Sequence, residues 1–190
     1  MATGAFPFWV AVSPDGRSVY VTSIQDDTVS QYDVGAGGAL LPKSPATVAA
    51  GAAPDGLAVS PDGGSAYVDN GNNDSVSQYD VGPRGALSPK SPATVPAGAD
   101  PVGVTVSPDG QSVYVANFFD GSLSQYDVGP RRALSPKSPA TVVTGGTPQQ
   151  VAVTPAQVPA SKEQCKNGGW RSFPQFKNEG LCIAFVNRGP

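Results

Sequence analysis

Apolar and polar residues alternate along most of the chain, and the alternating pattern itself recurs at a fixed interval. The tetrapeptide SPDG occurs at Ser13, Ser60 and Ser107, so each copy begins 47 residues after the last. The same step leads next to Thr154-Pro155, where the sequence departs from the repeat. A fixed period in this range is typical of solenoids, propellers and arrays.

Each repeat reads as four antiparallel strands. In the third repeat, 104–106 and 112–116 flank a Pro-Asp-Gly turn signal, and 122–128 alternates cleanly as a third strand. The segment 133–143 contains two prolines, which only an outer edge strand tolerates, because proline has no backbone N–H to donate to a ladder. Four strands that become less strand-like toward the last predict one propeller blade.

The repeat resembles a known family. The signature VSPDGRSVYVTS at 12–23, followed by DDTVSQYDV and GGAL, is similar to the YVTN-type repeat of lactonase-like seven-bladed β-propellers. The resemblance covers residues 6–155 and implies an all-β, partial or open propeller of four-stranded blades. It also implies catalytic polar residues in a central cleft, but no residue of this chain matches them, so we assign no catalytic residue.

The predicted organisation has three parts. Residues 1–155 form the propeller repeats, 156–163 a linker and 164–190 a cysteine-containing C-terminal tail. The repeats divide into blades at 6–53, 54–100 and 101–147, with the first strand of a fourth at 148–155.

The tail differs abruptly from the repeats in composition. It is similar to C-terminal tails of secreted actinobacterial proteins, and a turn at 167–169 with a strand at 181–186 predicts a small β-hairpin. Cys165 and Cys182 are expected to form a disulfide, since paired cysteines persist in exported proteins. The entropic stabilisation from such a loop is about 3 kcal/mol.

Three blades and one strand cannot close a ring, and an open arc leaves apolar blade faces uncovered. Three explanations remain open. The chain is a fragment of a longer protein, it pairs with a second copy to complete the propeller, or its tail covers one end. Residues 1–5 are too short and too polar for a secretory signal, and the chain starts inside a first strand, which favours the fragment.

Composition narrows the chemistry. Charged residues make up 14% of the chain and the formal net charge is -3, which gives no basic footprint for nucleic acid. No stretch is apolar enough to span a membrane. The chain has no histidine, which removes the usual proton shuttle and the commonest metal ligand. We therefore expect no metal and no cofactor.

Acidic loops are the remaining metal candidates. Asp26, Asp27 and Asp74 follow second strands, and this topology places them on the same face as Asp55 and Asp100. Such loops could hold calcium, but none has the regular ligand spacing of a dedicated site. Solvated turn aspartates are the favoured interpretation.

The differences between repeats gather on this same face. The second-to-third loops read SIQDD, NGNND and NFFDG, and the pairs after each anchoring proline also differ, from Phe8-Trp9 to Gln149-Gln150. We predict a recognition surface there, because binding uses exposed aromatic and amide side chains on rigidly held loops. Its residues are Trp9, Ile24, Asn70, Asn72, Phe118 and Phe119. The alternative is drift at positions where loops tolerate change.

Several recurring side chains have structural interpretations. SPDG is a turn. The tyrosines of SQYDV (Tyr32, Tyr79, Tyr126) are expected to pack between blades. The aspartates that follow them (Asp33, Asp80, Asp127) are expected to form hydrogen bonds with neighbouring backbone at the strand end. The lysine of SPKSP is expected to face solvent on an outer edge, where it would discourage the addition of a further strand.

The sequence predicts a non-enzymatic, secreted or surface-associated scaffold that binds a protein or glycan through its loop face. One alternative is a fragment of a lactone-hydrolysing or isomerising enzyme, and another is a structural repeat of the cell envelope. The absence of histidine argues against an enzyme. We expect an extracellular or cell-surface location.

Overall fold

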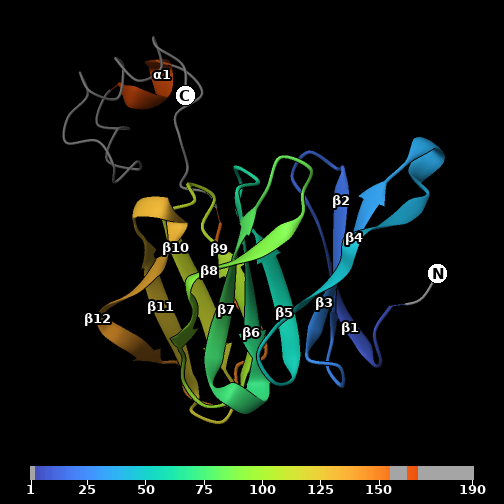
Figure 1. Cartoon of the computed structure of the whole chain (residues 1–190). Helices are drawn as coiled ribbons and strands as arrows, with labels where there is room; N and C mark the ends of the chain where they lie inside the picture. Colours follow the sequence, from blue (N-terminus) through green and yellow to red (C-terminus); the bar gives the residue numbers. More distant parts are fainter. Residues whose placement is uncertain (1–2, 155–161, 167–190) are drawn as a thin grey trace. The chain divides into compact units, whose positions relative to one another are not determined.

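The computed structural model describes residues 3–154 and 162–166 of the 190-residue chain (Figure 1). The chain divides into two compact units, Met1–Val153 and Thr154–Pro190. Three four-stranded antiparallel sheets stand side by side in the first unit. The predicted all-β partial propeller is confirmed, and each sheet is one blade.

Strands within each blade follow chain order from the inner to the outer edge. Blade one contains β1 (Pro7–Val12), β2 (Ser18–Ser23), β3 (Thr28–Val34) and β4 (Leu40–Ala49). Blade two contains β5 (Pro54–Val59), β6 (Ser65–Asn70), β7 (Ser75–Val81) and β8 (Leu87–Pro96). Blade three contains β9 (Pro101–Val106), β10 (Ser112–Asn117), β11 (Ser122–Val128) and β12 (Leu134–Val143). Short 3₁₀ turns occupy Ala36–Gly38, Gly71–Asn73 and Pro130–Arg132.

The SPDG turns join the first and second strands of every blade, as predicted. In blade one the Ser13 hydroxyl donates to Asp15 Oδ1 at 2.6 Å and accepts the Ser18 N–H at 2.9 Å. Gly16 follows at φ 71°, a conformation that favours glycine. The other two turns repeat these bonds, so each SPDG closes its hairpin by the same local chemistry.

The hydrophobic core lies between adjacent blades. One cluster joins blades one and two around Tyr20, Leu57 and Tyr79, and a second cluster joins blades two and three. The Tyr79 hydroxyl donates to Ala49 O of the preceding blade at 2.7 Å, and Tyr126 makes the equivalent bond. The prediction that Tyr79 and Tyr126 pack between blades is confirmed, and burying each side chain contributes about 1.5–3 kcal/mol. Tyr32 is buried in blade one, where its predicted place between blades stays a prediction.

The lysine of SPKSP does not face solvent, so that prediction is wrong. Lys43 and Lys90 are each only 7% exposed. Each pairs with the aspartate at the end of the third strand of its own blade, and donates to a carbonyl of the next blade, Arg84 O or Arg131 O. The expectation that these aspartates bond neighbouring backbone is therefore also wrong. The lysine fastens each blade to the next.

Blade one presents an uncovered apolar face. Val10 is 61% exposed, whereas Leu57, at the same repeat position in blade two, is 3% exposed because blade one packs against it. Phe6, Phe8 and Val12 are exposed beside Val10. Within residues 3–154 no sheet covers this face, as an open arc requires. The three explanations for the open arc stay predictions.

The segment after blade three lies where a fourth inner strand would lie. A Cβ on Gly103 would approach Gln149 O to 2.9 Å and Gln150 Cα to 3.2 Å, and a Cβ on Gly56 would approach Gly103 Cα to 3.2 Å. The packing step between blades thus continues into 148–153. Over 148–154, however, the described backbone makes no strand hydrogen bonds.

In the second unit the described residues are 154 and 162–166, and Lys162–Cys165 form a short helix, α1. The sequence did not predict this helix. Cys165 is buried. Its predicted partner Cys182, the predicted hairpin and most of the predicted linker lie outside the described residues, so the disulfide stays a prediction. Among the described helices none is long and apolar enough to cross a membrane.

Candidate functional site

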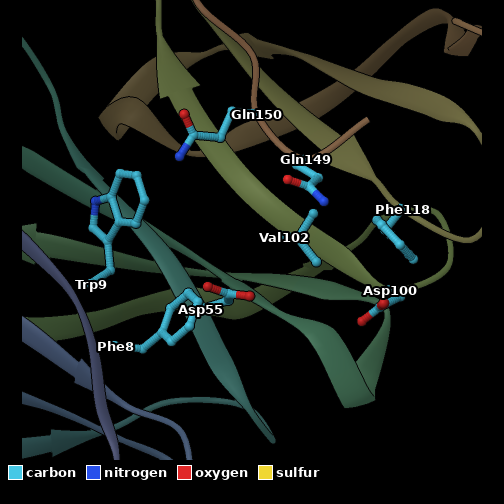
Figure 2. A pocket seen from close by; sticks show the side chains of 8 residues that line it. All are labelled: Phe8, Trp9, Asp55, Asp100, Val102, Phe118, Gln149 and Gln150. Carbon is cyan, nitrogen blue, oxygen red and sulfur yellow. The ribbon is translucent and has the colours of Figure 1, made fainter. Parts of the chain in front are cut away.

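A pocket of about 410 Å³ opens where the inner strands of the blades begin (Figure 2). Its volume lies in the range of small-molecule sites. We call it the inner-strand pocket, and its lining residues are Phe8, Trp9, Asp55, Asp100, Val102, Phe118, Gln149 and Gln150. Three aromatic rings, two carboxyl groups and two amides thus surround one cavity.

The pocket is built from one repeat position used four times. Phe8, Asp55, Val102 and Gln149 each directly follow the proline that anchors an inner strand. The repeating backbone brings these four positions to the same end of the blades. An aromatic ring, a carboxyl group, an aliphatic side chain and an amide therefore share one cavity without any change in the framework.

The pocket rim at Asp100 is fixed by hydrogen bonds on both sides of the residue. Its N–H donates to Asp74 Oδ1 at 3.0 Å, and its carbonyl accepts the Phe118 N–H at 2.8 Å. Asp100 has φ 52°, in the left-handed region that non-glycine residues seldom adopt. These bonds hold the strained backbone and keep the Asp100 side chain and the Phe118 ring on the same cavity.

A buried carboxyl group binds the backbone next to Asp55. Asp69, on β6, is fully buried and accepts the Gly56 N–H at 3.1 Å. A Cβ on Gly56 would come within 2.5 Å of Asp69 Oδ2, so only glycine fits between this carboxyl and the next blade. In the described structure Asp69 Oδ2 and the shielded Asp55 Oδ1 have no hydrogen-bond partner.

Burial controls the protonation of these carboxyl groups. Desolvation, followed by the charge of Asp100, raises the pKa of Asp55 from 3.8 to about 6. Burial also raises the pKa of Asp69 well above its usual range, with smaller contributions from neighbouring aspartates, and it raises the pKa of Asp100. A carboxyl with a pKa near neutrality is suited to accept and return a proton.

Two predicted recognition residues meet in the pocket, and four do not line it. Trp9 and Phe118 lie on opposite sides of the cavity. Phe119 is 74% exposed and makes an edge contact with the Phe118 ring, at 5.4 Å between centroids. Ile24 is half-buried and donates its N–H to Phe6 O, and Asn72 is exposed.

Asn70 belongs to the framework of blade two. Its side chain is fully buried, accepts the Gly51 N–H at 3.0 Å and donates to the hydroxyls of Ser75 and Ser77. Asn117 repeats the arrangement in blade three with Gly98, Ser122 and Ser124. An asparagine that uses its amide in this way has no group left for a ligand.

The acidic loops serve the backbone. Asp26, Asp27 and Asp74 accept the N–H groups of Ala5, Ala53 and Asp100 respectively. Among the described residues no group of three or more metal-ligating side chains lies close enough to hold an ion.

Sequence reasoning did not assign Asp55, Asp69, Asp100, Gln149 or Gln150 to the recognition surface. One signal for Asp69 was available, because blade two has an aspartate where the other blades have Thr22 and Ala116. Thr22 shows what that position does. Its hydroxyl accepts the Trp9 N–H at 3.0 Å and donates to Asp55 O at 2.7 Å.

Comparison with known families assigns this chain to a protein family. The family model described as "Lactonase, 7-bladed beta-propeller" matches residues 2–158. The chain belongs to this lactonase family. A comparison with curated proteins finds no match.

Solved structures similar to this lactonase-family chain are also propellers. A Pseudomonas aeruginosa periplasmic gluconolactonase is 26% identical with a TM-score of 0.63, and the match covers 75% of this chain and 42% of that one. For Kuenenia stuttgartiensis hydrazine synthase the identity is 26%, the TM-score 0.62 and the coverage 78% and 39%. A Bacteroides uniformis protein described as a candidate 6-phosphogluconolactonase shares the fold at 20% identity, TM-score 0.69 and coverage 78% and 43%. The chain thus spans about two fifths of these structures.

Proposed function

We propose that the inner-strand pocket hydrolyses a sugar lactone, with Asp55 as the general base. The observation that carries the proposal is a half-buried carboxyl group whose pKa is raised to about 6, facing a cavity that also holds two amides and three aromatic rings. The size of the cavity suits a ligand of one sugar ring.

The chemistry requires a base, an oxyanion donor and a proton for the leaving group. Asp55 accepts a proton from water, and the resulting hydroxide attacks the lactone carbonyl carbon. The side-chain amide of Gln149 or Gln150 donates a hydrogen bond to the oxyanion, the role that fixed donors serve in acyl transfer. The ring C–O bond then breaks, and Asp55 returns its proton to the leaving oxygen. One water is consumed and one hydroxy acid is formed.

The product acid and the pocket are both negatively charged. Hydrolysis converts an uncharged ester into a carboxylate, which then lies near Asp55 and Asp100. Like charges at short range repel one another. Release of the acid is therefore favoured without any movement of the blades.

Kinship supports this alternative better than the non-enzymatic scaffold that the sequence suggested first. The chain belongs to the lactonase family, and a gluconolactonase from Pseudomonas aeruginosa is among the similar structures. The absence of histidine does not remove the base, since a carboxyl group with a raised pKa serves that purpose.

The test is acid release from D-glucono-1,5-lactone, followed in a pH-stat with the uncatalysed rate subtracted. We expect kcat/KM to rise as the pH increases through about 6, because only ionised Asp55 is a base. Asp55→Asn should lower kcat about 10²–10⁴-fold. Asp109→Asn is the matched control, because Asp109 lies in the SPDG turn beyond the far end of β9.

Two results would contradict the proposal. One is hydrolysis no faster than the blank across pH 5–8, and the other is an Asp55→Asn variant as active as Asp109→Asn. Saturable binding of the sugar without turnover would instead restore the scaffold interpretation.

A further inference from the structure

Every lysine and arginine in residues 3–154 lies toward the end of the blades remote from the inner-strand pocket. Arg17 is in a first-to-second-strand turn, and Arg84, Arg131 and Arg132 are in the loops between third and fourth strands. Lys43, Lys90 and Lys137 lie on outer strands and pair with aspartates near the same loops. All of these cations therefore lie away from the inner-strand pocket.

The pocket end carries only acidic charge among residues 3–154. Asp55 and Asp100 line the cavity, and Asp69 accepts the N–H of Gly56, the residue that follows Asp55. Asp26, Asp27, Asp74 and Asp120 sit in the second-to-third-strand loops of the same end and accept backbone N–H groups. The pocket end is therefore acidic, whereas cations and aspartates nearly balance at the opposite end.

Resting on the proposed function, we propose that the inner-strand pocket selects an uncharged sugar lactone and rejects its phosphorylated counterpart. No described lysine or arginine lines the cavity to neutralise a phosphate group. A phosphate monoester carries nearly two negative charges at neutral pH. Bound beside Asp55 and Asp100, it would lie well within a Debye length of both, which is about 8 Å at physiological salt.

An uncharged sugar finds suitable partners in the same cavity. Figure 2 shows the rings of Phe8 and Trp9 on one side and that of Phe118 on the other, with the amides of Gln149 and Gln150 between them. Aromatic faces suit the C–H surface of a sugar ring, and carboxylate and amide oxygens accept hydrogen bonds from its hydroxyls. The lining thus satisfies a neutral polyol and leaves a phosphate without a donor of positive charge.

The names of two similar structures refer to the phosphorylated and the unphosphorylated substrate. One is described as a candidate 6-phosphogluconolactonase and the other as a gluconolactonase. The charge of this pocket favours the unphosphorylated substrate class.

Equilibrium binding separates charge selection from catalysis. The probes are D-glucono-1,5-lactam, in which N–H replaces the ring oxygen and resists hydrolysis, and the same lactam phosphorylated at O6. Quenching of Trp9 fluorescence reports occupancy, and Trp9→Phe shows which part of the signal comes from the pocket. We expect the neutral lactam to bind at least about tenfold more tightly at 20 mM salt. Raising the salt to 300 mM should reduce this ratio, because screening weakens the repulsion.

Removing the acidic charge should remove the preference. Asp55→Asn/Asp100→Asn should bring the two dissociation constants to within about threefold, whereas Asp109→Asn should leave their ratio unchanged. Equal or tighter binding of the phosphorylated lactam to the unaltered chain would overturn the inference. A result in which neither lactam binds would overturn it as well. Selective lactam binding without lactone turnover would support the charge selection while refuting the proposed hydrolysis.

Discussion

Replacing Asp55 with asparagine should stabilise the fold at neutral pH. Burial raises the pKa of this carboxyl from 3.8 to about 6 in the folded chain. A folded-state pKa above the unfolded value means that the folded protein binds the proton more tightly. The resulting stability is complete below about pH 4 and is lost as the pH rises through 6. At pH 8 the native chain carries the full penalty, and an asparagine does not.

The size of the penalty follows from the change in pKa. A rise from 3.8 to about 6 corresponds to about 3 kcal/mol at 1.36 kcal/mol per pKa unit. Asp55 is only half-buried, so solvent screening reduces the expected gain to about 1–2 kcal/mol. For a chain of this length the melting temperature at pH 8 should rise by about 2–8 °C.

Urea unfolding followed by circular dichroism at pH 4 and pH 8 tests the reasoning. Asp55→Asn should be more stable than the unaltered chain at pH 8 and equal to it at pH 4. Asp62→Asn is the control of opposite sign, because hydrogen bonds from the Ser60 hydroxyl and the Gly64 N–H lower the pKa of Asp62. It should lose stability at pH 8. An Asp55→Asn advantage that is the same at both pH values would refute the electrostatic explanation.

Two further predictions use the repeat as its own control. The Tyr67 hydroxyl donates to Arg132 O of the next blade at 2.9 Å, so Tyr67→Phe should lower the free energy of unfolding in urea by about 1 kcal/mol. Tyr114→Phe should lower it little, because Tyr114 makes no such bond within the described residues. Lys90→Met should cost about 1.5–3 kcal/mol by the same assay, because Asp80 loses its ion pair and the Arg131 carbonyl of blade three loses its hydrogen-bond donor. Lys137→Met, whose side chain is 23% exposed, should cost less; equal losses would contradict the role of Lys90 between blades.

The blades themselves could be predicted because their signals are local. Each SPDG turn, each SQYDV strand and each proline-bearing outer strand is specified by residues that lie within a few positions of one another. The inner-to-outer strand order then follows from hairpin connections alone. That is why the predicted third-blade strands agree with β9, β10, β11 and β12 to within a few residues.

The buried lysines could not be predicted by the same reasoning. Lys43 lies between two prolines, a context that favours an exposed edge, but its acceptor Arg84 O is 41 residues further along the chain. The surroundings of Gly56, the residue after Asp55, likewise depend on Asp69 and on Gly103 of the following blade, which no local pattern contains. Charges and partners set by the neighbouring blade are therefore the part of the site that sequence reasoning misses.

The repeat also explains how the lining of the inner-strand pocket can differ between blades on one framework. The backbone just before the anchoring prolines Pro54 and Pro101 is fixed by bonds that do not involve the variable side chain, because Asp27 accepts the Ala53 N–H and Asp74 accepts the Asp100 N–H. The residue that follows the proline is then free to be Phe8, Asp55, Val102 or Gln149 while the core between blades stays the same. Because these equivalent positions converge on one cavity, a single substitution changes the pocket without moving a strand. In blade two the buried Asp69 accepts the Gly56 N–H next to Asp55, and because burial raises the pKa of Asp69 well above its usual range, the ionised form of this carboxyl lowers the stability of the fold.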